Sequence, residues 1–354
     1  MGLTFEHVSL GQRVLFGSGK AAENLVAEVA RFDAKRVMVI ASGAGAQVAA
    51  DVSAGIEVAV NYGDVAAHVP IEKAEKARAT AAGHRIDLLV SIGGGSTTGL
   101  AKAVAMTSGL PIIAVPTTYS GSEATNVWGL TEASRKSTGV DDRVLPATVI
   151  YDAALTLSLP VGLSVASGLN GMAHCIDSMW APGSDPINQA LAAEGIRALN
   201  RGLPRIFKDP QDLAGREQAL YGAYLSAVAF ASAGSGMHHK ICHVLGGTWK
   251  MPHAQTHATV LPYVLAFNAP QAPDAAARIA DAFGSEDPAA GLDRLRTAVD
   301  APKALKDYGF AEKNIPKAVE LILPVVPASN PRKVTHSNLT ELLTAAWAGT
   351  APGI

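Results

Sequence analysis

Cysteine, aromatic residues and net charge are all scarce in this 354-residue chain. Its two cysteines, Cys175 and Cys242, each stand next to a histidine in sequence, and two cysteines do not make a disulfide framework. Aromatic residues make up 5% of the chain and the formal net charge is -2. Such a chain offers neither stacking platforms nor a basic stripe, so we expect no nucleic-acid partner.

Long hydrophobic runs are also missing. The stretch at residues 221–237 is apolar but short, and its Gly, Ala and Ser content is typical of a buried helix rather than a membrane span. The N-terminal segment has no positive region followed by an apolar one, and Glu6 stands where a myristoylation signal has Ser or Thr. We therefore expect a cytoplasmic protein with no membrane partner.

Strand and helix patterns alternate in the first half of the chain. Short apolar runs next to turn residues predict buried parallel strands at residues 36–41, 86–92, 110–115 and 147–152, with a weaker fifth at 56–60. Helix patterns lie between them at residues 71–82 and 97–107, and a short hairpin is predicted ahead of the Gly17-Ser18-Gly19 turn. We predict an α/β domain with a parallel sheet at residues 1–158.

Helical spacing dominates the second half. Strand patterns stop at about Leu159, and Ala/Leu-rich segments predict helices that include residues 188–203, 215–233 and 316–323. A single core stops growing at about 250–300 residues, so a chain of this length favours two domains. We predict an all-helical second domain at residues 159–354.

A glycine turn in the first domain predicts a dinucleotide site. Gly93, Gly94 and Gly95 follow the predicted strand at 86–92, where they allow close backbone approach and present a helix N-terminus to a pyrophosphate. A second polar turn follows the next strand, and the two turns lie on the same side of a parallel sheet. Ser42, after the first strand, stands where an acidic residue could grip a ribose hydroxyl. The predicted cofactor contacts are Ser42, Gly93, Gly94, Gly95, Ser96, Thr97, Thr117, Thr118, Ser120 and Ser122.

Histidine is concentrated in residues 236–262, which hold five of the ten in the chain. His239 and His243 are four residues apart, so helical spacing places both on one face, and His253 follows a predicted break at Gly246-Gly247. A single histidine on an apolar face is more often a hydrogen-bonded core residue. Paired spacing within one segment favours a site.

Asn170 and His174 repeat the four-residue spacing in another predicted helix. Pairs of N and O donors on two helices, with a histidine from a following loop, are the usual basis of a transition-metal site. A divalent ion on neutral imidazoles normally gains from a carboxylate, whereas Asn170 supplies a neutral amide. The pattern indicates a metal site without its charged ligand, so we predict no bound metal.

Seven motifs in order resemble the iron-containing alcohol dehydrogenase family over essentially the whole chain. They are FGSG at 16–19, GGGSTTGLAK at 93–102, PTTYSGSE at 116–123, DAALTLSLP at 152–160, NGMAH at 170–174, the histidine segment, and Asn330-Pro331-Arg332. The resemblance implies an α/β dinucleotide-binding domain followed by an all-helical domain, the arrangement also found in dehydroquinate synthase. It further implies a homodimer that uses NADH or NADPH.

Within the family, the chain is most similar to members that reduce the C=C bond of maleylacetate, a small dicarboxylate, to 3-oxoadipate in aromatic-ring degradation. By position, His174, His239 and His253 match the ligating histidines of metal-dependent relatives, and His243 matches the active-site histidine outside the metal shell. Gly99 and Asn170 stand at or near positions where those relatives have aspartate. The resemblance thus implies catalytic histidines without a metal, which can be cationic or donate hydrogen bonds.

Substrate contacts implied by the resemblance and by charge are Asn170, Tyr119, Lys240 and Arg332, with Lys250 and Lys333 as further candidates for the carboxylates. Three alternatives remain open. One is an Fe- or Zn-dependent alcohol dehydrogenase of the same fold, and another is a lyase similar to dehydroquinate synthase, in which the nicotinamide is reoxidised in each cycle. A nucleotide sensor without catalysis would have no use for clustered histidines.

Overall fold

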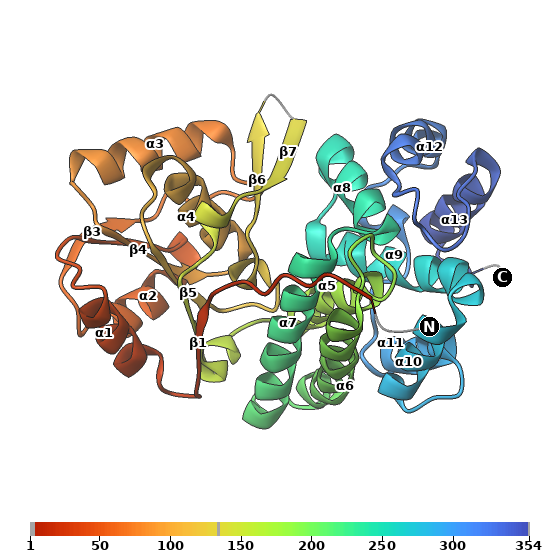
Figure 1. The fold of residues 1–354 in the computed structure, drawn as a ribbon, viewed down its shortest axis with the longest axis horizontal. Helices are drawn as coiled ribbons and strands as arrows, with labels where there is room; N and C mark the ends of the chain where they lie inside the picture. The colour runs from red at the N-terminus through yellow and green to blue at the C-terminus, as the bar shows by residue number, and fades with distance from the viewer. Residues whose placement is uncertain (1–3, 133–134, 353–354) are drawn as a thin grey trace. The chain divides into compact units, whose positions relative to one another are not determined.

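The computed structural model describes residues 4–132 and 135–352, which form two compact units (Figure 1). The sheet unit spans Leu10–Leu159. The helical unit begins at Pro160 and also takes in the described residues before Leu10. The sequence-based division assigned those first residues to the sheet domain, whereas in the structure they group with the helices.

The sheet unit is built on six parallel strands in the order β1-β8-β5-β4-β2-β3. Short strands rich in Val and Ile have few polar side chains that could face water. Such strands are typical of a sheet that is covered by helices on both faces. All five strands expected from the sequence are present, with ends moved by one or two residues. The strands are β1 (Arg13–Phe16), β2 (Val37–Ile40), β3 (Val58–Tyr62), β4 (Leu88–Gly93), β5 (Ile112–Pro116) and β8 (Thr148–Tyr151).

Helices cover both faces of this sheet. Val37 and Val39 of β2 pack under α1 (Ala21–Arg31) and α2 (Ala46–Ser53). The alternate residues Met38 and Ile40 pack under α3 (Ile71–Gly83) and α4 (Gly95–Ser108). Because side chains alternate along a strand, each strand contributes to both layers of core. The architecture is doubly wound, and it confirms the predicted α/β domain with a parallel sheet.

The predicted hairpin near the N-terminus is wrong. Residues Arg13–Phe16 form a single edge strand that pairs in parallel with β8. An antiparallel hairpin occurs later, between β6 (Val127–Glu132) and β7 (Arg135–Val140), where none was predicted. An apolar run predicts a strand but does not identify its partner, and the partner of β1 lies more than 130 residues away in sequence.

The helical unit contains helices of 8 to 23 residues. Among the described residues, none of its helices is both long enough and apolar enough to cross a membrane. Both cysteines are free and buried, as expected. The helices are α5 (Val161–Ser178), α6 (Pro186–Lys208), α7 (Leu213–Ala233), α8 (Met237–Trp249), α9 (His253–Asn268), α10 (Pro273–Phe283), α11 (Pro288–Ala298), α12 (Ile315–Ile322) and α13 (His336–Ala348).

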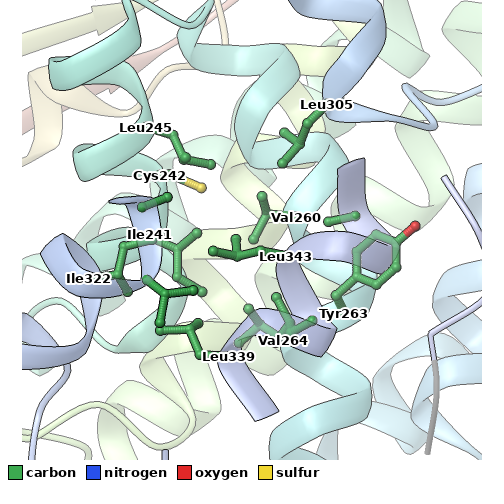
Figure 2. Close-up of a cluster of buried hydrophobic side chains, with 14 of the residues drawn as sticks. Ile241, Cys242, Leu245, Val260, Tyr263, Val264, Leu305, Ile322, Leu339 and Leu343 are labelled. Carbon is green, nitrogen blue, oxygen red and sulfur yellow. The ribbon is translucent and has the colours of Figure 1, made fainter. Parts of the chain in front are cut away.

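One hydrophobic cluster fixes the two helices that carry most of the histidines. Ile241 and Leu245 of α8 and Val260 and Val264 of α9 pack with side chains of α12 and α13, such as Leu343 (Figure 2). All five are at most 1% exposed. Burying each of them stabilises the fold by roughly 1.5–3 kcal/mol. The opposite faces of α8 and α9 are thereby held in fixed orientations.

The predicted break at Gly246-Gly247 is also wrong. Helix α8 continues through both glycines to Trp249, and the chain turns at Lys250, whose φ of 55° is left-handed. Each glycine disfavours a helix by about 1 kcal/mol relative to alanine. Packing of Leu245 in the core and of Trp249 against Phe310, with ring centroids 5.2 Å apart, offsets that cost. His253 is consequently the first residue of α9 and not part of a loop.

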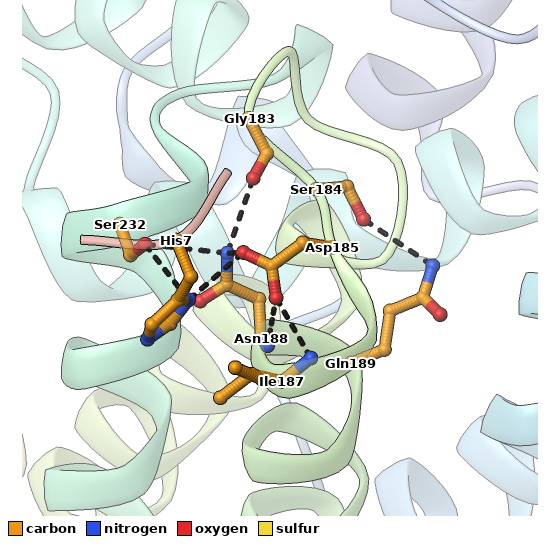
Figure 3. A network of polar contacts seen from close by, with 8 residues as sticks. All are labelled: His7, Gly183, Ser184, Asp185, Ile187, Asn188, Gln189 and Ser232. Carbon is orange, nitrogen blue, oxygen red and sulfur yellow. Dashed lines mark hydrogen bonds and ion pairs between the residues drawn. The ribbon is translucent and has the colours of Figure 1, made fainter. Parts of the chain in front are cut away.

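Residues before Leu10 join the helical unit through a polar network (Figure 3). His7 Nδ1 lies 2.9 Å from Asp185 Oδ2 and 3.5 Å from the Ser232 hydroxyl. The same aspartate is the N-cap of α6 and accepts hydrogen bonds from the backbone N–H groups of Ile187 and Asn188. A helix cap therefore also anchors the N-terminal segment.

Candidate active site

The sheet unit has a topological switch point between β2 and β4. From β2 the chain passes to β3 on one side, and from β4 it passes to β5 on the other. Ligands of open parallel sheets bind at such a point, outside the carboxyl ends of the strands. Ser42 follows β2, Gly93 ends β4, and Ile40 pairs with Ser91 in the register between the two strands. Ser42 and the glycine turn are therefore neighbours at the expected place.

The three positions of the glycine turn leave no room for a side chain. Gly93 has a φ of 151°, and a Cβ atom there would lie 2.6 Å from Thr97 Oγ1. A Cβ on Gly94 would lie 3.0 Å from Thr118 Cγ2, and one on Gly95 would lie 3.1 Å from Ser120 Oγ. The glycine turn and the second turn are thus packed against each other at the start of α4. The first N–H groups of that helix have no intrahelical acceptor and favour an anion.

Two hydroxyls beside the glycine turn have no hydrogen-bond partner among the described residues. These are Thr118 Oγ1 and Ser120 Oγ, both buried. A buried hydroxyl without a partner costs about 1–3 kcal/mol, so an acceptor or donor from a ligand would be favourable there. Thr117 N donates to Gly93 O at 3.1 Å, which ties the two turns together. Ser122 lies further along and begins a short 3-10 segment.

Other polar residues of the two motifs have structural roles. Tyr119 is fully buried and donates to Thr156 Oγ1 at 3.2 Å, so the structure places this predicted substrate contact in the core of the sheet unit. Lys102 Nζ donates to the carbonyl oxygens of Thr125 and Val127, both at 2.8 Å. Burial lowers the pKa of Lys102 to about 7. This lysine holds the chain after the second turn against α4.

Six histidines of the helical unit form one cluster, which includes all four that were predicted to be catalytic. His239 lies at its centre, with its ring centroid 4.9 Å from that of His174, 4.9 Å from that of His257 and 6.0 Å from that of His243. The centroids of His253 and His257 are 4.4 Å apart. The members are His174 of α5, His238, His239 and His243 of α8, and His253 and His257 of α9.

Asp177 organises one side of the cluster, and the sequence analysis did not identify it. Its Oδ2 atom lies 2.7 Å from His239 Nδ1 and accepts a hydrogen bond from the N–H of Gly236 at 2.8 Å. Longer bonds at 3.4 Å come from the N–H groups of His238 and His239. Asp177 follows His174 by three residues on the same helix face, a spacing that could have indicated it.

His238 and His257 were counted in the sequence but received no role. In the structure, His238 Nε2 lies 3.0 Å from His257 Nδ1 and 3.6 Å from Cys242 Sγ. All three side chains are at most 2% exposed. His257 follows His253 by four residues, the same spacing that pointed to the other histidines, and so it could have been included.

Burial keeps the inner histidines neutral. It lowers the pKa of His174 to about 4 and of His238 to about 3, and it holds the pKa values of His239 and His257 well below the ordinary value, with help from neighbouring histidines. These four act as neutral donors or acceptors and not as cations. His243 is half-buried and His253 is exposed, so these two are the members that solvent reaches most readily.

Three positions that the resemblance matches to metal ligands lack charge here. Asn170 Oδ1, His174 Nδ1 and His239 Nε2 are buried and have no hydrogen-bond partner among the described residues. The nearby carboxylate of Asp177 already accepts hydrogen bonds from His239 and the backbone. A divalent ion among neutral donors in a buried site would keep an uncompensated charge. The set does not fit such an ion.

A different trio meets the geometric requirement for metal binding. Across residues 4–132 and 135–352, the one group of His, Cys, Asp or Glu whose ligand atoms all lie within 4.8 Å of one another is His238, Cys242 and His257. Burial raises the pKa of the Cys242 thiol well above its ordinary value. Metals bind the thiolate, so burial weakens this trio as a metal site.

The predicted carboxylate contacts separate in the structure. Lys240 is half-buried on α8, next to His239 and three residues before His243, so it stays beside the cluster. Arg332 stacks over the ring of Phe267 at 4.5 Å. Phe267 follows His253 by 14 residues on α9, about 21 Å along the helix at 1.5 Å per residue. Arg332 is therefore not brought to the histidines, and Lys250 and Lys333 are exposed.

Comparisons with known proteins identify the family of the chain. Residues 11–153 match the model described as iron-containing alcohol dehydrogenase, and residues 164–347 match the C-terminal model of the Fe-containing alcohol dehydrogenase family. A maleylacetate reductase of Sphingobium indicum is 42% identical over 352 residues, which is 99% of each chain.

Two solved structures show the same fold. An iron-containing alcohol dehydrogenase from Corynebacterium glutamicum superposes with a TM-score of 0.97 at 62% identity over 98% of each chain. Maleylacetate reductase from Agrobacterium tumefaciens does so with a TM-score of 0.94 at 35% identity over 99% of this chain and 100% of that one. The chain belongs to the iron-containing alcohol dehydrogenase family and is an oxidoreductase that uses a nicotinamide cofactor.

Proposed function

We propose that this chain is a maleylacetate reductase, which reduces the C=C bond of maleylacetate to give 3-oxoadipate. The observation that carries the proposal is a six-histidine cluster in which the ligand position on α5 holds Asn170 instead of a carboxylate. Support comes from full-length similarity to several proteins named maleylacetate reductase, at about 39–42% identity.

The reaction needs a proton donor and not a Lewis acid. The ketone of maleylacetate is conjugated with its double bond, so the addition of hydride at the carbon β to the ketone leaves an enolate. Bound NADH or NADPH supplies that hydride from C4 of its nicotinamide. One proton must then reach the α carbon, so substrate, reduced cofactor and one proton give 3-oxoadipate and oxidised cofactor. Neutral imidazoles can donate hydrogen bonds to the enolate oxygen and return the proton.

His243 and His253 are the proposed residues for this step. They are the least buried members of the cluster and so can contact a substrate. His243 serves as donor to the enolate or as proton source, and His253 and His174 bind the dicarboxylate. Lys240 stands one turn before His243 and is the candidate that remains beside the cluster for a carboxylate.

The cofactor contacts are proposed at the switch point of the sheet. The glycine turn with Ser96 and Thr97 approaches the pyrophosphate, and the unpaired hydroxyls of Thr118 and Ser120 face the same turn. Ser42 stands where ribose recognition is usual. Thr117 and Ser122 belong to the same second turn and remain candidates.

The reaction is proposed to proceed without a metal. The neutral donor set of Asn170, His174 and His239 lacks the carboxylate that a divalent ion would need. The competing proposal is an Fe- or Zn-dependent alcohol dehydrogenase. It is favoured by the family name that the Corynebacterium glutamicum relative carries and by the ligand geometry of His238, Cys242 and His257.

An absorbance assay tests the two proposals together. Oxidation of NADH and NADPH is followed with maleylacetate beside simple aldehydes and ketones, on protein purified without chelators and on protein treated with EDTA. Maleylacetate-dependent oxidation that survives EDTA supports the proposal. Turnover of simple carbonyls alone, restored by Fe or Zn after chelation, would favour the competing activity. Cytoplasmic location and a homodimer stay predictions.

A further inference from the structure

We propose that Asp177 is a positioning residue that fixes His239 as the Nδ1–H tautomer, so that the Nε2 lone pair of His239 faces the interior of the histidine cluster. The proposal rests on the proposed function only for the part of its test that uses turnover. Its structural part concerns one carboxylate, one imidazole and the first turn of α8.

Both carboxylate oxygens of Asp177 face hydrogen-bond donors. Oδ2 is 2.7 Å from His239 Nδ1 and 2.8 Å from Gly236 N, and Oδ1 is 3.4 Å from His238 N. The backbone groups belong to the N-terminus of α8, where N–H groups lack intrahelical partners and the helix dipole favours negative charge. Burial raises the pKa of Asp177, and the backbone N–H bonds oppose that rise. When the carboxylate is ionised it accepts from all of these donors, and the proton it shares with His239 then lies on Nδ1.

The site is built around this carboxylate. Asp177 is 1% exposed and His239 is 1% exposed, so water does not compete for either group. A Cβ on residue 236 would lie 2.3 Å from Asp177 Oδ1, so glycine at 236 lets the carboxylate approach the helix end. On its other side the ring of His239 lies against those of His174 and Phe230, with centroids 4.9 Å and 4.4 Å away.

The opposite nitrogen of His239 has no hydrogen-bond partner among the described residues. With the proton held at Nδ1, Nε2 of His239 is a hydrogen-bond acceptor. The other proposed roles in the cluster are to donate hydrogen bonds and to return a proton to the substrate. Asp177 does not contact the reacting atoms and acts through His239, as second-shell carboxylates do when they orient ligand histidines. His239 would then accept a hydrogen bond from the substrate or from a neighbouring imidazole.

Asp185 provides a control within the same helical unit. It is buried, caps the N-terminus of α6 by accepting backbone N–H bonds from Ile187 and Asn188, and pairs with a histidine Nδ1, that of His7. Asp185→Asn and Asp177→Asn each replace a buried carboxylate that accepts backbone N–H bonds at a helix N-terminus and lies beside a histidine. Only Asp177→Asn places an amide against a histidine of the cluster.

The first test is the tautomer itself, measured by ¹⁵N NMR of histidine-labelled full-length protein without substrate, with His239→Gln used to assign the signal. We expect a protonated Nδ1 and an unprotonated Nε2 at His239 in the parent, and a changed His239 signal in Asp177→Asn but not in Asp185→Asn. A parent His239 that carries its proton on Nε2 overturns the proposal, whatever the substrate of the enzyme proves to be.

The second test is turnover. Asp177→Asn should lower kcat for maleylacetate by roughly 10–100-fold, with KM and NADH binding within a few fold. Asp177→Glu, which keeps the charge, should recover part of that loss, and Asp185→Asn should lose thermal stability to a similar extent without a comparable fall in kcat. Equal losses of kcat in both asparagine variants would make Asp177 a cap only and overturn the positioning role.

Discussion

His238 Nε2 lies 3.0 Å from His257 Nδ1, and this hydrogen bond joins helices α8 and α9 behind the predicted catalytic histidines. Both rings are at most 1% exposed. The ring centroid of His257 also lies 4.4 Å from that of His253, which is proposed to bind the substrate. The hydrogen bond from buried His238 therefore fixes a residue that contacts His253.

Loss of this pair should destabilise the fold. His257→Ala leaves His238 Nε2 without its imidazole partner in a dry interior, which costs about 1–3 kcal/mol in addition to the cavity. A double-mutant cycle with His238→Ala, measured by urea unfolding, should give a coupling free energy of about 0.5–3 kcal/mol. His336→Ala, at an exposed position on α13, serves as the control. Additive effects of the two core substitutions would exclude a contribution from the hydrogen bond.

His243→Ala should impair chemistry and leave cofactor binding intact. We expect kcat for maleylacetate to fall by roughly 10²–10⁴, the usual range for one acid–base group, with the Kd for NADH within a few fold. Steady-state kinetics and NADH fluorescence titration measure the two quantities. If only KM rises, His243 is a binding group, and the proton must come from another donor such as His253.

Asn170→Asp should restore a charged ligand position. The parent is expected to keep its activity after EDTA treatment, because Asn170, His174 and His239 are neutral. The aspartate variant should bind Zn²⁺ or Fe²⁺ more tightly, as measured by calorimetry and metal analysis, and should lose part of its native activity. Inactivation of the parent by EDTA with recovery on adding Fe²⁺ or Zn²⁺ would show that a metal is required.

Ser42 should permit both cofactors. It neither repels a 2′-phosphate, as a carboxylate would, nor pairs with it, as an arginine would. The ratio of kcat/KM between NADH and NADPH should therefore stay below roughly a hundredfold, or ~2.7 kcal/mol. Ser42→Asp should shift the ratio toward NADH by roughly tenfold or more, about 1.4 kcal/mol. A larger preference in the parent would point to another residue.

The free energy of unfolding should fall as the solution is acidified below about pH 6.5. Below this pH the buried histidines are protonated in the unfolded chain but stay neutral in the folded chain. Each of them therefore lowers the free energy of unfolding by about 1.4 kcal/mol per pH unit of acidification. Asp177 and Glu123, whose pKa values burial raises, act in the opposite direction but are two groups against four. Urea unfolding at several pH values measures the slope, and a flat profile would contradict it. The four are His174, His238, His239 and His257.

The positions of the strands along the chain and the glycine turn could be predicted from the sequence because both depend on local pattern. The segment 86–92 is short, apolar and followed by glycine, and its length together with the flanking glycine favours a buried strand over a helix. The partner of a strand is not local, so the edge position of β1 was missed. The continuation of α8 through Gly246 and Gly247 was missed for the same reason, since Leu245 and Trp249 stabilise it from outside the segment.

The site shows the same division. His174, His239, His243 and His253 follow helical spacing and were identified, whereas Asp177 contacts His239 across 62 residues of sequence. Arg332 packs on Phe267, far along α9 from His253, and the motif that contains Arg332 carries no information about that packing. Charge and spacing thus found the cluster, and tertiary contacts decided which residues orient it.

The bond between His7 and Asp185 makes the sheet unit an insertion within the helical unit. The backbone leaves the helical unit after Ser9 and re-enters it at Pro160. During synthesis, His7 is made first, and its partner Asp185 is made 178 residues later. The complete sheet unit is therefore available for folding before the N-terminal segment can dock, and this contact closes one of the longest loops in the chain.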